Sequence, residues 1–123
     1  METEFRSLIL GLGLMSAERI NWGTHPQGLG WPGIVLTMVD DFVGLTLDGV
    51  AGVSSARVQV DIYAVTFVEA RALAASVDSQ LQAYRGGVFR KIFRMSRRAG
   101  RDTQSEEAPI RISADYSVRW NSA

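Results

Sequence analysis

The sequence contains no cysteine and a single histidine, His25, and these two scarcities exclude several kinds of site. Without thiolates the chain can form neither a disulfide framework nor a zinc–cysteine centre. The one histidine lies in a loop rich in proline and glycine, so any metal site would need carboxylates alone. We therefore expect no metal and no cofactor, and a chain that is stable without covalent cross-links, as suits an intracellular setting.

The sequence also lacks the motifs of common active sites. Two Gly-Leu-Gly triplets occur, but neither follows a strand pattern and opens a helix, as a dinucleotide loop requires. Asp40 and Asp41 are adjacent, so on a strand they point to opposite faces and cannot act together on one substrate. Ser54 and Ser55 have no accompanying base or nucleophile-elbow motif. We expect a protein that is not an enzyme.

Long apolar runs are missing as well. No run approaches the roughly 20 residues of a membrane span, and acidic residues precede the first apolar run, where a signal peptide has basic ones. The 123 residues, about half of them apolar, fit one globular domain over residues 1–123. We expect a soluble cytoplasmic product with no membrane partner.

The formal net charge is zero, but the charges are segregated along the chain. Residues 1–84 hold four arginines and nine acidic residues, whereas residues 85–101 hold six arginines, one lysine and no acid. This pattern suits contact with a complementary surface, either a second copy of the chain or a polyanion. A solvated basic strand face is the simpler alternative.

Periodicity predicts two helices. Apolar residues at i, i+3, i+4 and i+7 predict a short helix over about residues 3–15. A capping box formed by Thr66 and Glu69 precedes a longer apolar stripe that reaches Tyr84. Gly86 and Gly87 follow the stripe and predict a glycine C-cap and a turn.

Four strands are predicted from alternation, at residues 34–40, 57–64, 89–96 and 110–120. Residues 21–33, 42–55 and 100–109 are predicted to be loops. The order of elements predicts an α+β fold: a mainly antiparallel four-stranded sheet with two helices packed on one face and a long loop between the first two strands.

The basic segment 85–101 also permits a second interpretation, a nucleic-acid-binding domain. Phe89 and Phe93 interleave with Arg90, Lys91 and Arg94, as in sheets that bind single strands. However, simple alternation places both rings on one strand face and assigns them to the core, which leaves charge without stacking. An interface or a channel wall accounts for the same charges.

Two stretches carry a resemblance to a known family. They are "GTHPQGLGWPGIVLTMV" and "LTLDGVAGVSSARVQVDIYAVTFVEARALAASVDSQLQAYRG". Together they resemble the tail completion, or tail terminator, proteins of long-tailed phages and bacterial gene transfer agents. The likeness spans about Arg19 to Trp120, and its matching pieces are Pro32, Leu47–Gly49, Ala56–Asp61, Tyr63, Glu69–Ala74 and Trp120. The basic run and residues 97–107 have no counterpart in the family pattern.

The resemblance implies a structural role. Such proteins form a ring, six-fold in the family, that caps the tail tube, stops its polymerisation and meets the head-completion (stopper) proteins, with DNA passing through without sequence specificity. Implied partners are therefore further copies of the chain, the tail tube protein, the stopper protein and DNA in transit. The implied location is the head–tail junction of a virion that is assembled in the bacterial cytoplasm.

Two sets of residues are candidates for the contacts of such a ring. The 42–55 loop is predicted to be a docking element that touches a neighbour or the tube, through Leu45, Leu47, Asp48, Gly49, Val50 and Gly52. The second set would lie at the ring interface or line the lumen: Arg57, Gln59, Asp61, Arg90, Lys91, Arg94, Arg97, Arg98 and Arg101. We favour pairing of the basic residues with the acidic part of an adjacent subunit, because a strongly basic lumen would retain DNA.

Overall fold

The computed structural model describes residues 1–26, 28–46, 49–101 and 109–121, with backbone only at residues 40–53 and 101. The helices are α1 (Glu2–Leu10), the short 3₁₀ turn η1 (Ala17–Arg19) and α2 (Phe67–Leu81). The strands are β1 (Ile20–Trp22), β2 (Gly33–Thr46), β3 (Gly49–Ala64), β4 (Tyr84–Gly86), β5 (Phe89–Arg101) and β6 (Ile110–Asn121).

The strands form one six-stranded sheet in the order β1-β2-β3-β6-β5-β4. All neighbours are antiparallel except β1 and β2, which are parallel. The predicted α+β class is confirmed, but the prediction of four strands is wrong, because β1 and β4 extend the sheet at its two edges. Each has three residues, too few to show an alternation in the sequence.

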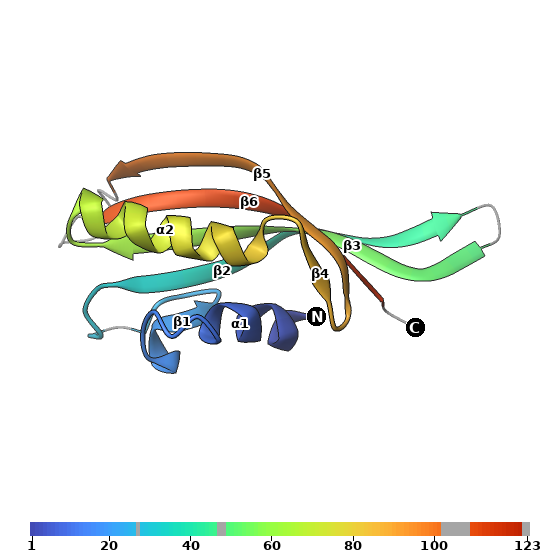
Figure 1. The fold of residues 1–123 in the computed structure, drawn as a ribbon, viewed down its shortest axis with the longest axis horizontal. Coiled ribbons are helices and arrows are strands. Elements are labelled where there is room, and N and C mark those ends of the chain that lie inside the picture. Colours follow the sequence, from blue (N-terminus) through green and yellow to red (C-terminus); the bar gives the residue numbers. More distant parts are fainter. Residues whose placement is uncertain (27, 47–48, 102–108, 122–123) are drawn as a thin grey trace.

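Both helices cover the same face of the sheet (Figure 1). Alternate residues of the central strands point toward them and are buried, including Val58, Val60 and Ile62 of β3 and Ile112 of β6. The helices contribute matching apolar stripes, which contain Phe5 and Ile9 of α1 and Ala70, Ala74, Val77 and Leu81 of α2. Among the described residues, no helix is long and apolar enough to cross a membrane.

Helix α2 begins as predicted. The Glu69 backbone N–H donates to the Thr66 hydroxyl oxygen at 3.2 Å, which satisfies one of the free donors of the first turn. Its end differs from the prediction, because the residue with left-handed backbone after the helix is Ala83 (φ 62°), not a glycine. Gly86 and Gly87, both with positive φ, instead serve the turn that joins β4 to β5.

The predicted loop at residues 42–55 is mostly β structure. β2 and β3 stay paired as far as Thr46 and Gly49, although β6 pairs with β3 only as far as Val53. The hairpin therefore projects beyond the sheet as a two-stranded ribbon (Figure 1), which we call the arm, residues 44–46 and 49–52. Glycines and a register shift between Val43 and Leu45 obscure the alternation here, so the sequence resembles a loop.

Strand β5 contains two β-bulges, between Phe89 and Lys91 and between Arg94 and Ser96. Each bulge shifts the alternation by one residue. Phe89 is therefore in the core at 5% exposure, whereas Phe93, which pairs with Ser117, lies on the opposite face of the sheet. The expectation that both rings share one face is wrong.

Candidate assembly surfaces

The arm carries the first set of predicted contact residues. Leu45, Gly49, Val50 and Gly52 lie on its paired backbone, whereas Leu47 and Asp48 fall outside the described residues. Val43 and Ser54 form the last β2–β3 pair at which β6 still lies beside β3. Ten residues of the chain lie between them. Backbone pairing gives the arm a direction away from the sheet, although a two-stranded ribbon gains little stability of its own.

The second surface is the face of the sheet opposite the helices, which we call the helix-free face. The register places Gln59 beside Asp115 and Asp61 beside Ser113, and it places Arg98 beside Ser113 on the next strand. Arg57, Gln59 and Asp61, the three β3 residues predicted for an interface or lumen, therefore share this face. Its β3 side chains are polar where those of the other face are apolar, whereas Val35 of β2 and Phe93 of β5 are apolar residues on this face.

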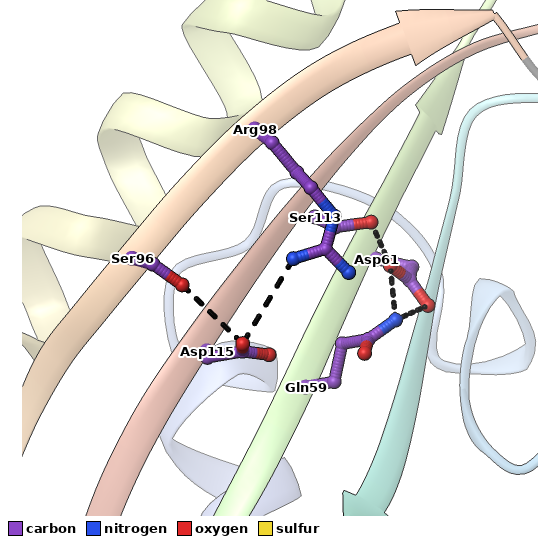
Figure 2. Close-up of polar contacts among 6 residues, drawn as sticks. All are labelled: Gln59, Asp61, Ser96, Arg98, Ser113 and Asp115. Atoms are coloured by element: carbon purple, nitrogen blue, oxygen red, sulfur yellow. Dashed lines mark hydrogen bonds and ion pairs between the residues drawn. The ribbon is translucent and has the colours of Figure 1, made fainter.

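A buried carboxylate, that of Asp61 on β3, lies on this face (Figure 2). Asp61 is only 5% exposed. The Gln59 side-chain amide donates to its two oxygens at 3.0 and 2.9 Å, and the Ser113 hydroxyl donates to Oδ1. Because a buried polar group is costly unless it is hydrogen-bonded, these donors hold the Asp61 side chain in place, and the bond from Ser113 links β3 to β6.

A second carboxylate lies further along β6. Asp115 Oδ2 accepts from the Ser96 hydroxyl at 3.3 Å and lies 3.9 Å from Nη1 of Arg98 (Figure 2). Its Oδ1 is buried without a hydrogen-bond partner among the described residues, as is Nε of Arg57 on the same face. Buried polar atoms are nearly always bonded. Both atoms are buried within the face and are not part of its accessible surface.

The basic residues of β5 are divided between the two faces. In the strand register Lys91 lies opposite Arg119 and Arg98 lies opposite Ser113, so both are on the helix-free face. Arg94 and Arg97 lie on the helix-covered face. Arg90 is exposed at the first bulge, and the side chain of Arg101 is outside the description. The segment is therefore not a single basic patch.

Arg94 has an acidic partner in its own chain. Its Nη1 lies 3.1 Å from Asp78 Oδ2 on α2, and the Tyr116 hydroxyl donates to the other oxygen of Asp78 at 2.8 Å. Burial, together with this hydrogen bond and the charge of Asp78, raises the pKa of Tyr116 well above its ordinary value. This polar contact joins α2 to β5 and β6.

An aromatic stack, which the sequence analysis missed, lies beside the start of β2. The His25 ring stacks on Trp31 at 4.5 Å between centroids, and Trp31 stacks on Tyr63 at 5.0 Å. A side chain at Gly33 would bring its Cβ to 2.5 Å from the His25 ring, so glycine is required there. Nε2 of His25 bonds the Leu29 carbonyl at 2.8 Å. His25 thus anchors a loop, and the described residues contain no cluster that could hold a metal.

The fold is shared with a known virion component. It matches a chain in a structure titled "Virion of native gene transfer agent (GTA) particle" with a TM-score of 0.59 and 18% sequence identity. The match covers 91% of this chain and 83% of that chain, so it includes nearly the whole domain. Identity at this level establishes a common fold. Neither models of known families nor curated protein sequences match the chain.

Proposed function

We propose that this protein is a structural virion protein that forms a ring on the end of a phage-like tail tube. The ring terminates tail polymerisation, joins the tail to the head-completion proteins and lets DNA pass through its lumen. The observation that carries the proposal is the fold, which nearly the whole chain shares with a chain of a gene transfer agent virion. The sequence resemblance to tail terminators supports it independently.

The arm and the two faces of the sheet suit such a subunit. A projecting ribbon can reach the tube or a neighbour, and the helix-free face offers exposed polar side chains, such as Arg98 and Arg119, that a second surface can bond. The two ends of the sheet also differ, so contacts between copies can run head to tail and close into a ring.

Tail length tests the proposal. Deleting the gene should give overlong tubes detached from heads, measured by electron microscopy of the particles, and restoring the gene should return the normal length. A second variant, in which a two-residue turn replaces residues 44–53, keeps the Val43–Ser54 pair and the body of the sheet. It should fold, as circular dichroism would show, and yet also fail to terminate tails. Normal tails joined to heads in the deletion strain would refute the proposed function.

A nucleic-acid-binding domain is the second candidate, and one observation favours it. The bulge places Phe93 on the helix-free face, with Nζ of Lys91 5.5 Å from the ring centroid and Arg119 opposite Lys91 on β6. An aromatic ring among cations is the arrangement on which single-stranded bases stack. Tight, salt-sensitive retention of oligonucleotides by the isolated protein, lost in Phe93→Ala, would favour this candidate.

A further inference from the structure

The sheet has a free segment of strand at each edge. β1 pairs only with Ile34–Leu36 of β2, so residues 37–46 of β2 have β3 as their single neighbour among the described strands. At the other edge, β4 pairs with β5 no further than Ile92. The Arg94 backbone N–H donates to the Gln82 side-chain oxygen, and beyond it residues 95–101 of β5 have β6 as their single neighbour among the described strands. Free edges are templates for another chain, so proteins normally protect them.

Each free segment carries an exposed apolar residue at a bulge. Val39 lies at the register shift between Met38 and Asp40 and is 39% exposed. Met95 lies at the shift between Arg94 and Ser96 and is 55% exposed. These are two of only five large apolar side chains that are exposed on the described part of the molecule.

The two bulges lie at the same height on opposite edges of the sheet. The register connects Met38 through Val58 and Tyr116 to Arg94, so the residues just before Val39 and just before Met95 lie in one row across four strands. A copy placed beside the first by rotation alone, about an axis along the strands, would therefore bring Met95 close to Val39.

The charges of the two segments are opposite. Residues 37–46 contain Asp40 and Asp41 and no basic residue, whereas residues 95–101 contain Arg97, Arg98 and Arg101 and no acid. The segments at the two edges thus attract each other, while each repels its own duplicate. The strand directions also agree: β2, β3, β6 and β5 alternate, so β5 of one copy runs antiparallel to β2 of the next.

We propose that the free edge of β5 in one copy docks against the free edge of β2 in the next, head to tail, with Met95 against Val39. The proposal rests on the proposed ring and names the contact that closes it. Two different edges make a heterologous contact, which propagates in one direction and closes into a ring when the rotation allows. The competing account is that the bulges and charges protect the edges from any pairing.

Disulfide trapping tests the contact cleanly, because the chain has no cysteine of its own. Three variants are made in cells that produce the particles: Val39→Cys, Met95→Cys and the double variant. Both sites are exposed, so folding should be unaffected. A disulfide needs the two Cα atoms within about 7 Å. After oxidation, the double variant should give a ladder of covalent oligomers on a non-reducing gel, whereas each single variant should stay monomeric.

A mixture of the two single variants should give a covalent dimer and nothing larger, since only one junction can form per pair. A matched control combines Val39→Cys with a cysteine at the exposed Ala72 of α2, and it should give no ladder. Dimers from Met95→Cys alone would show that like edges meet and would overturn the proposal. If the particles contain the chain but the double variant gives no ladder, the proposed contact is overturned as well, whereas the proposed function survives. A ladder in extracts whose particles lack the chain would uphold the contact and refute the virion role.

Discussion

The two faces of the sheet are made by the same strands, yet they are held in different ways. The helix-covered face is apolar along nearly its whole length, and its side chains gain stability by leaving water. The helix-free face instead holds Asp61 and Asp115 in hydrogen bonds that fix side-chain positions. The comparison teaches that the first face maintains the fold, while the second maintains the shape of a surface.

The largest expected difference comes from truncating neighbouring residues on the two faces. Leu36 is fully buried under the helices, and the adjacent Thr37 is exposed on the other face. Leu36→Ala should lower the free energy of unfolding by about 2–5 kcal/mol, because it removes buried methyl groups and leaves a cavity. Thr37→Ala should change it by less than about 0.5 kcal/mol.

Urea unfolding of both variants measures the difference. The slope of the unfolding free energy with urea serves as the control, since it should be unchanged if both variants remain two-state. Similar losses at the two positions would mean that the helix-free face contributes to stability as much as the core does, which would abolish the distinction.

A middle-sized effect is expected at Asp61, because its buried and hydrogen-bonded carboxylate gives this position of the helix-free face a share in folding stability. Asp61→Ala leaves the Gln59 amide and the Ser113 hydroxyl without their acceptor, which should cost about 2–3 kcal/mol. Asp61→Asn keeps the shape and one acceptor oxygen, so it should cost less. Equal losses for the two variants, measured by thermal unfolding, would show that the shape and the acceptor oxygen kept by asparagine contribute nothing, and that the full carboxylate is what matters at this position.

The parts of the fold that could be predicted from sequence are those in which one periodicity persists. α2 combines a capping box with an uninterrupted apolar stripe, and β6 alternates without a break from Ile110 to Trp120. The arm was missed because glycines and a register shift break its alternation, and β1 and β4 were missed because they are very short. A bulge cannot be seen in a sequence, which is why Phe93 was assigned to the wrong face.

The candidate surfaces were predictable to a similar degree. The alternation of β3 placed Arg57, Gln59 and Asp61 together on the face away from the core. The bond between Asp61 and Ser113 was beyond sequence reasoning, since the residues are 52 positions apart and only the register joins them. The ion pair between Arg94 and Asp78 could not be predicted from sequence either, because it depends on where α2 crosses the sheet.

The smallest expected effect concerns the contact of Tyr116 with Asp78 on the helix-covered face. This contact should also make the free energy of unfolding depend on pH. Tyr116→Phe removes one hydrogen bond but leaves Asp78 paired with Arg94, so it should cost about 1 kcal/mol at pH 7. Because the folded pKa of Tyr116 is raised, its contribution is complete below the unfolded pKa of about 10 and is lost as the pH rises further. The gap between wild type and Tyr116→Phe in urea unfolding should therefore shrink between pH 9 and pH 11, whereas a constant gap would mean that Tyr116 ionises as readily in the folded chain as in the unfolded one.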